Sequence, residues 1–210
     1  MKLSLIGMSG SGKSYWSKKL QEQKGFKRFC SDDLIEKKLS SELKKFGYSG
    51  LHDVAKWLGQ PFNLQNEERR RKYLYFEKEA MREILKAIEH SNNYNENIVV
   101  DTTGSVIYTE KWILEKLSEL TQVIYLDTPV SVQEKMYKLY LEDPKPVIWG
   151  NSFTKINGES NFEAMRRCYP KLLAFRSKWY KKIAHIILEY NLLRDPNFSV
   201  EEFMEAINHD

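Results

Sequence analysis

A glycine-rich stretch near the N-terminus places the strongest limits on how this sequence can fold. The stretch Gly7-Met8-Ser9-Gly10-Ser11-Gly12-Lys13-Ser14 matches the phosphate-binding pattern G-x-x-x-x-G-K-[ST] at every fixed position. An apolar run over residues 3–6 precedes it and a helix-like segment over 15–23 follows it. Glycines allow successive N–H groups to turn inward and form an anion site at a helix N-terminus. A simple glycine-serine turn is the alternative, but the strand and helix on either side favour a phosphate site.

The motif assigns a role to each of its polar residues. Lys13 would reach the terminal phosphates of a bound nucleotide, and the Ser14 hydroxyl would ligate Mg²⁺. We therefore predict that the cofactor contacts come from the whole stretch Gly7, Met8, Ser9, Gly10, Ser11, Gly12, Lys13 and Ser14, together with Tyr15 just after it.

The composition is typical of one globular α/β domain. The chain has 210 residues, of which 30% are charged, and a net charge of +4. This length predicts a single domain over 1–210 with a sizeable core. Two cysteines far apart, Cys30 and Cys168, indicate neither a disulfide framework nor a zinc site and fit a reducing compartment.

Targeting signals are not expected. The phosphate loop begins at Gly7, which leaves no room for a cleaved leader, and no apolar run approaches the roughly 18 residues that span a bilayer. We therefore expect a cytoplasmic protein with no membrane partner.

Apolar runs and helix-like segments alternate along the chain, which predicts a doubly wound five-stranded parallel sheet. The predicted strands cover 3–6, 26–30, 98–101, 122–126 and 184–189. The predicted helices cover 15–23, a segment from about 34, 63–90, 111–120, 130–141, 161–182 with an interruption at Tyr169-Pro170, and 199–207. Polar loops are expected over 91–97 and 192–198.

Two segments are predicted to cover the sheet rather than belong to it. Residues 40–62 are broken by glycines and a proline, and we expect a small helical cap there. Residues 142–160 resemble a lid, because prolines begin a loop that holds Gly150 and Gly158. Trp149 and Phe153 favour a lid that faces the substrate over an ordinary surface connection.

Carboxylates follow two of the predicted strands. Asp32 and Asp33 come after the second strand, and loops at the carboxyl ends of parallel strands line the ligand crevice. Ser31 or Asp32 could also simply cap the next helix. Asp101 ends the third strand, where it could hold the metal or act as a base, although an aspartate in a surface turn is the alternative. Gly104 would let the substrate approach the backbone closely.

Arginines after the predicted lid are candidates for a transition-state clamp. Arg166, Arg167 and Arg176 have the fixed fork that suits phosphate or carboxylate. Surface salt bridges are the competing explanation for any one of them. The mixed run over 67–72 favours a solvated helix face, although its arginines could reach an anionic ligand.

Taken together, these features resemble the nucleoside-monophosphate-kinase branch of P-loop proteins, and within it the shikimate kinase family. The similarity rests on the opening motif, on Asp32-Asp33-Leu34-Ile35-Glu36 after the second strand, and on the loop before Ser199-Val200-Glu201-Glu202. It also rests on a tract that is similar to the family's P-L-L…R…Y…A, formed by Pro170, Leu172, Leu173, Arg176, Tyr180 and Ala184.

The resemblance implies a role for individual residues. Asp32 would bind the substrate hydroxyl and act as its base, Arg176 would hold an anionic group, and the loop from Arg194 would flank the adenine. The substrate site would also include Asp33, Thr103 and Gly104.

Three positions depart from the family's pattern. Cys30 replaces a metal-associated Asp, residues 73–77 hold no counterpart of a substrate-binding Arg, and Thr102-Thr103-Gly104 replaces a triple glycine. Asp101 could take over the metal role.

The sequence therefore predicts an ATP-dependent kinase that uses Mg²⁺ and phosphorylates a hydroxyl of an anionic small molecule, as a monomer or weak dimer. Lys13, Asp32 and Asp101 would carry the chemistry with one of the three arginines. A nucleotide or nucleic-acid 5′-hydroxyl kinase is an alternative, although no dense basic stripe favours nucleic acid. A non-catalytic nucleotide-binding adaptor is the other alternative.

Overall fold

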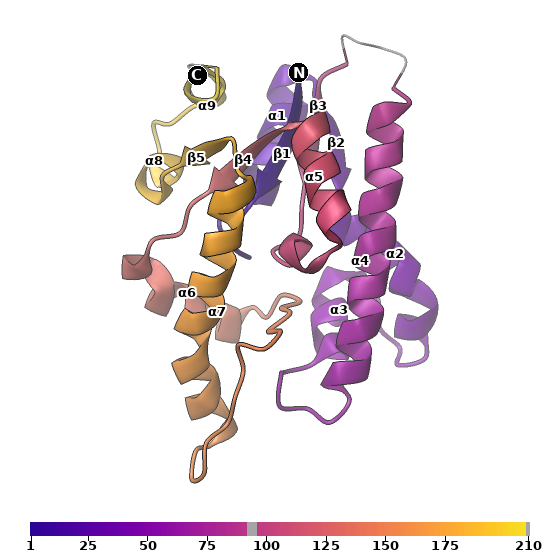
Figure 1. Cartoon of the computed structure of the whole chain (residues 1–210), viewed down its shortest axis with the longest axis vertical. Coiled ribbons are helices and arrows are strands. Elements are labelled where there is room, and N and C mark those ends of the chain that lie inside the picture. The colour runs from indigo at the N-terminus through magenta and orange to yellow at the C-terminus, as the bar shows by residue number, and fades with distance from the viewer. Residues whose placement is uncertain (92–95, 209–210) are drawn as a thin grey trace.

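Five parallel strands form a single sheet at the centre of the molecule. The computed structural model describes residues 1–91 and 96–208, and Figure 1 shows the arrangement of its elements. The strands are hydrogen-bonded in the order β2-β3-β1-β4-β5. Their bounds are β1 Lys2–Ile6, β2 Lys27–Cys30, β3 Ile98–Asp101, β4 Gln122–Leu126 and β5 Ile186–Leu188. The strand that precedes the phosphate loop is therefore the central one, and its carboxyl end lies between those of β3 and β4.

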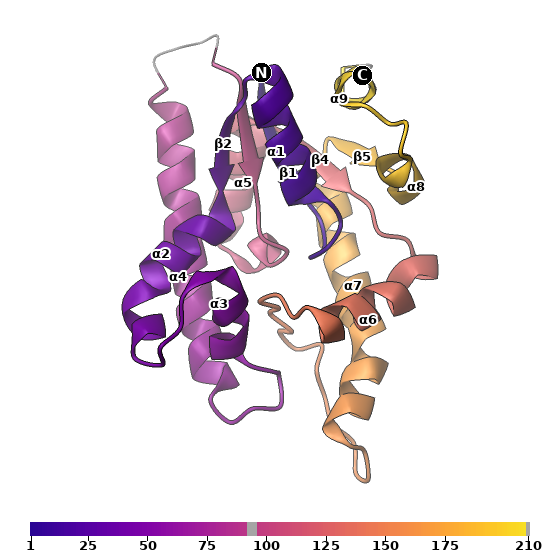
Figure 2. The same ribbon diagram turned by 180° about the vertical axis from the view of Figure 1, so that it is seen from behind.

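Alternation along the strands divides the core into two layers. Leu3 and Leu5 of β1 pack on one face of the sheet, and Ile6 packs on the other, because successive side chains of a strand point to opposite faces. One face is covered by α1 (Lys13–Lys24) and α9 (Val200–Ala206), where Phe203 stacks on Trp16 at 4.8 Å between ring centroids. Figure 2 shows α1 in front of the sheet on this side.

The other face is covered by longer helices. These are α4 (Asn66–Glu89), α5 (Lys111–Leu120) and α7 (Asn161–Ile183), which stand in front of the sheet or beside it in Figure 1. Buried apolar side chains from all three helices join those of the strands in one cluster. Helices on both faces make the sheet doubly wound, as the sequence predicts.

The remaining helices lie near the carboxyl ends of the strands or on the periphery. They are α2 Ser31–Lys44, α3 Gly50–Leu58, α6 Gln133–Glu142 and α8 Tyr190–Arg194, with short 3-10 turns at Val106–Tyr108 and Val130–Val132. Of the polar loop expected over 91–97, residues 92–95 lie outside the described part of the chain. The loop expected over 192–198 is wrong in its first part, which belongs to α8.

Two further expectations about helices are wrong. Helix α2 begins at Ser31, and Cys30 occupies its N-cap position without a side-chain hydrogen bond, so neither Ser31 nor Asp32 caps it. Helix α7 runs through Pro170 without interruption. A proline inside a helix costs about 3 kcal/mol, but the ring of Pro170 lies on the exposed side while Leu172, Leu173 and Tyr180 are buried against the core. Packing of this long apolar face outweighs the local cost.

A separate apolar cluster holds the cap together. Side chains of α2, α3 and α4 meet around Val54, Trp57 and Leu58, all buried. Ile148, from the segment that follows α6, is buried in the same cluster. The Tyr140 hydroxyl also donates to the Oε1 atom of Gln60 at 2.6 Å, and Arg70 donates to the Gly150 carbonyl at 3.3 Å. The segment after α6 is therefore tied to the cap rather than free.

No helix within residues 1–91 and 96–208 has the length and apolar character needed to cross a membrane.

Candidate active site

The phosphate loop joins the end of β1 to the start of α1. Gly7, Gly10 and Gly12 have φ values of +145°, +80° and +109°, which residues with a side chain rarely adopt. A Cβ atom at Gly7 would also lie 2.8 Å from the Leu126 carbonyl oxygen. The glycines are thus required by both conformation and space, which explains the fixed glycines of the motif.

Lys13 lies across the mouth of this loop. Its ammonium group donates to the carbonyl oxygens of Gly7 at 2.9 Å and Met8 at 2.8 Å. Burial lowers the pKa of Lys13, and the nearby Asp101 and Asp32 carboxylates act in the opposite direction. A phosphate group would supply the anionic partner that this buried ammonium lacks.

A cleft of about 710 Å³ opens beside the loop. Most of the predicted site residues line it: Ser9, Gly10, Gly12, Lys13, Ser14, Tyr15, Asp32, Thr103, Gly104 and Arg194. Three residues of the loop, Gly7, Met8 and Ser11, are buried and do not line the cleft. The wall opposite the loop comes from α6 and the segment after it, including Met136, Tyr140 and Val147.

Asp32 lies in the first turn of α2, at the end of β2, and is half-buried in the cleft. Burial raises the pKa of Asp32 to about 6, although the positive charge of Lys13 acts in the opposite direction. A carboxylate with this pKa can accept a proton near neutral pH. Asp33, in contrast, is exposed and lies outside the cleft, with its Oδ2 atom 3.8 Å from the Arg28 guanidinium.

Asp101 ends β3 and is almost fully buried. Its Oδ2 atom accepts from Arg28 at 2.6 Å and from the Ser17 hydroxyl at 3.1 Å. Its Oδ1 atom has no hydrogen-bond partner among residues 1–91 and 96–208. One oxygen of the Asp101 carboxylate is therefore bound by Arg28, which the sequence-based predictions did not include.

The residues present can accommodate Mg²⁺ on one condition. The described residues contain no group of three or more His, Cys, Asp or Glu side chains that could hold a metal. Mg²⁺ commonly keeps several waters and takes one or two protein oxygens plus substrate phosphates. The exposed Ser14 hydroxyl and the free Oδ1 atom of Asp101 fit this pattern if nucleotide phosphates complete the set.

Cys30 lies beside Asp101 across the β2–β3 ladder. Burial raises the pKa of the Cys30 thiol to about 12, and the Asp101 carboxylate adds to this effect. The thiol is therefore neutral near pH 7 and is a poor ligand for a magnesium ion.

The three candidate arginines lie in different surroundings. Arg176 is buried and donates to the Ile148 carbonyl at 2.6 Å, and its Nε atom has no hydrogen-bond partner among the described residues. Arg166 and Arg167 lie near the opposite end of α7 and are paired with Glu134 at 2.8 Å and Glu159 at 2.5 Å. The structure places only Arg176 near the cleft, behind Gly104, where a Cβ atom would lie 3.0 Å from its guanidinium.

At the other end of the cleft, Arg194 of α8 donates to the Gly10 carbonyl at 2.6 Å and lies over the Tyr190 ring. Tyr15 is exposed on the same side. Arg194, Tyr190 and Tyr15 all line the cleft beside the phosphate loop.

Several cleft residues are absent from the sequence-based set. Lys145, which is paired with Asp143 at 2.7 Å, lines the wall opposite the loop. Its position between Pro144 and Pro146 was a possible signal, because the prolines fix the backbone there. Trp149, expected to face the substrate, instead packs on Tyr140 and Tyr169.

Known proteins are similar to this chain in sequence and in fold. No family model matches the chain. The shikimate kinase of Francisella tularensis subsp. novicida is 27% identical over 187 residues, which cover 89% of this chain and 84% of that protein. The shikimate kinase of Francisella philomiragia is 28% identical over 194 residues, with the same coverage.

Solved structures show the same fold. Shikimate kinase from Acinetobacter baumannii, in complex with shikimate, has a TM-score of 0.61 and 19% identity, and the match covers 99% of this chain and 92% of that one. Deoxyadenosine kinase from M. mycoides has a TM-score of 0.56 and 15% identity, with 99% of both chains covered. The chain is thus similar to shikimate kinases along most of its sequence, and its five-stranded parallel sheet with flanking helices has the P-loop kinase fold.

Proposed function

We propose that this protein is an ATP-dependent small-molecule kinase, which transfers the γ-phosphoryl group of ATP to a hydroxyl of its substrate. The observation that carries the proposal is that Lys13, in a phosphate-binding loop, and Asp32, a half-buried carboxylate, line the same cleft. The sequence similarity to shikimate kinases supports the same reaction class.

The chemistry requires alignment and positive charge more than covalent participation by the protein. The loop amides and Lys13 would hold the phosphates, while Asp32 would accept the proton of the substrate hydroxyl. The hydroxyl oxygen would bond to the γ-phosphorus as the bond to the β-phosphate oxygen breaks, which releases ADP. Bound Mg²⁺ would neutralise charge on the phosphate oxygens, and Ser14 and Asp101 are the residues that would hold it.

The remaining positive charge would come from Arg176 and Lys145. Arg176 has no carboxylate partner within 4.0 Å in the described chain, and its Nε atom is free, so an anionic group of the substrate is a suitable partner. Arg166 and Arg167 are left out of this proposal, because their acidic partners hold them away from the cleft.

The proposal is tested by phosphotransfer assays with purified protein, ATP and Mg²⁺. The acceptor panel is shikimate, deoxyadenosine and dephospho-coenzyme A, taken from the names of the similar proteins. We expect transfer to at least one acceptor, and a loss of about 100-fold or more in Lys13→Met, because Lys13 stabilises charge on the transferred group.

Lys18→Met is the matched control, because Lys18 is exposed on the same helix and outside the cleft. Nucleotide binding without transfer to any member of a wider metabolite panel would instead favour the nucleotide-binding adaptor. No thermal shift with any magnesium nucleotide would contradict both.

A further inference from the structure

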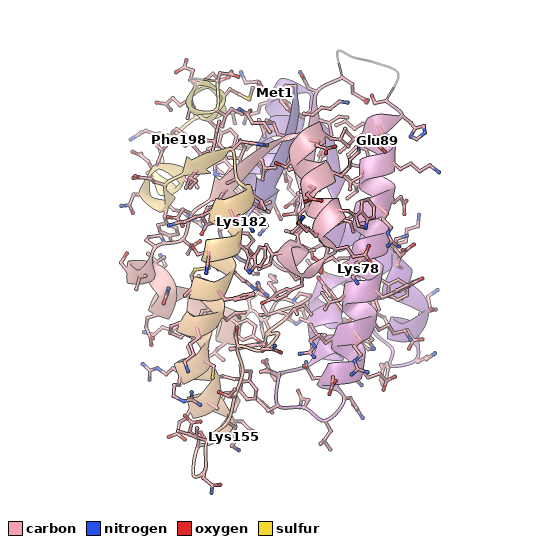
Figure 3. All side chains as sticks on the ribbon, viewed as in Figure 1. Met1, Lys78, Glu89, Lys155, Lys182 and Phe198 are labelled. Carbon is pink, nitrogen blue, oxygen red and sulfur yellow. The ribbon has the colours of Figure 1, made fainter. Side chains whose placement is uncertain are left out.

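Glu77 is a buried carboxylate that the proposed reaction does not use. It lies in the middle of α4, next to Lys78, which Figure 3 shows midway along the helix. The side chain is 0% exposed, and no Lys, Arg or His of the described chain forms a salt bridge with it. Its Oε2 atom has no hydrogen-bond partner in the part of the chain that the structure describes. A buried carboxylate without a cation is costly, so its presence calls for a specific role.

The partners of Glu77 belong to the turn that lines the cleft. Its Oε1 atom accepts from the hydroxyl of Thr103 and from the hydroxyl of Ser105, the latter at 2.9 Å. Burial raises the pKa of Glu77 to about 7, and these two hydrogen bonds act in the opposite direction. Glu77 thus binds the residues on both sides of Gly104, Thr103 and Ser105.

The opposite side of the same turn is held by α7. The Tyr180 hydroxyl donates to the Gly104 carbonyl, and the Arg176 guanidinium lies 3.0 Å from the position of a Gly104 Cβ atom. That position is also 3.2 Å from the backbone nitrogen of Ser9 in the phosphate loop. The turn is therefore clamped between α4 and α7 where the phosphate loop meets the rest of the cleft.

The clamp determines what Thr103 can offer to a ligand. Its hydroxyl donates to Glu77 and accepts from the Ser105 backbone N–H at 3.1 Å, so its hydrogen-bonding capacity is directed to the protein. Thr103 and Gly104 line the cleft together with Asp32, so the position of this turn sets the space that an acceptor has beside the Asp32 carboxylate.

We propose that Glu77 is a positioning residue for the acceptor: it fixes the Thr103-Gly104-Ser105 turn as a rigid wall of the cleft beside the phosphate loop. This inference rests on the proposed kinase function. Glu77 would affect the affinity for the acceptor without contacting the acceptor.

The test compares Glu77→Ala and Glu77→Gln in steady-state assays, with shikimate as the first acceptor and the other panel members if shikimate is not phosphorylated. Loss of the clamp in Glu77→Ala should raise the KM for the acceptor about tenfold, because two hydrogen bonds that fix the wall are lost. The KM for ATP should stay within about twofold. Glu77→Gln keeps an oxygen that accepts from both hydroxyls, so it should restore the acceptor KM to within about threefold of wild type.

Glu79→Gln is the matched control, because Glu79 lies on the same helix and pairs with Arg82 at 2.6 Å on the surface. If Glu77→Ala does not fold, Ser105→Ala removes one of the two bonds and should raise the acceptor KM by a smaller factor.

Three results would overturn the proposal: an unchanged acceptor KM in the alanine variants, equal losses for ATP and acceptor, or a Gln variant as impaired as the Ala variant. Wild-type protein that binds nucleotide but phosphorylates no acceptor would overturn the kinase function, and the role of Glu77 with it. Active wild type with any of the three results would overturn the role of Glu77 alone.

Discussion

Asp32 combines an accessible carboxylate with a raised pKa, and this combination predicts the pH dependence of catalysis. Burial raises the pKa of Asp32 to about 6, so the residue is protonated below that pH and cannot accept a proton. We expect kcat/KM to fall about tenfold for each pH unit below about 6 and to level off above it. Asp32→Asn should lower kcat by about 10²–10⁴-fold.

Asp33→Asn is the control for Asp32, since Asp33 is adjacent but exposed and outside the cleft. A pH profile that is flat from about pH 5 upward, or an Asp33 variant as impaired as the Asp32 variant, would contradict the role of Asp32 as the base.

Site residues are predictable from the sequence where a motif requires one particular backbone geometry. The glycines of the phosphate loop and Lys13 belong to this group, because the motif needs their φ values and spacing. Glu77 was missed although it lies four residues after the buried Tyr73 and three before the buried Ala80, on the inward side of α4. A charged residue on an apolar face was the available signal, but its partners come from a turn that only the tertiary structure brings close.

At the scale of elements, strands and long helices were predictable and their junctions were not. The sheet follows from apolar runs that alternate with periodic helices, and β3 matches its predicted bounds of 98–101. Pro170 predicted an interruption in α7 that packing overrides. Segment 142–160 was predicted as a lid, but the sequence could not show that Ile148 packs into the core of the cap.

A buried ion pair joins the side chains of β2 and β3, in addition to their backbone ladder. Arg28 of β2 binds Asp101 of β3 at 2.6 Å, with 12% and 2% of their side chains exposed. Arg28→Met would leave a buried carboxylate without its main cation, which costs about 3–5 kcal/mol. We expect a loss in the free energy of unfolding toward the lower end, because Lys13 still lies near Asp101.

Urea unfolding measures this loss, and Lys27→Met is the control. Lys27 is on the same strand and pairs with Glu96 at 3.2 Å on the surface, where an ion pair contributes about 1 kcal/mol or less. Arg28→Met/Asp101→Asn should recover part of the loss. Equal destabilisation by the Arg28 and Lys27 variants would show that the pair does not stabilise the sheet.

At the scale of the whole molecule, two buried acids predict how stability depends on pH. Burial raises the pKa of Asp32 from 3.8 to about 6 and that of Glu77 from 4.5 to about 7. Between the unfolded and folded pKa values the folded state binds more protons than the unfolded state, so the free energy of unfolding falls as pH rises. We expect a loss on the order of 2–4 kcal/mol from about pH 5 to about pH 7.5.

Urea midpoints at the two pH values measure this slope, and Glu77→Gln should flatten it because an amide does not titrate. Glu79→Gln is the matched surface control on the same helix, since Glu79 pairs with Arg82 at 2.6 Å. A wild-type stability that rises over this interval would contradict the raised pKa values.

The surroundings of the two native cysteines allow fluorescent dyes to be attached selectively at introduced thiols. Cys30 holds its proton far above neutral pH, and Cys168 is 0% exposed. Maleimide dyes would therefore react with thiols newly introduced at His52 of α3 and Lys138 of α6, both exposed, while the native sulfurs stay unlabelled. Energy transfer between such dyes would report the separation of α3 and α6 in single molecules, without any prior removal of cysteine.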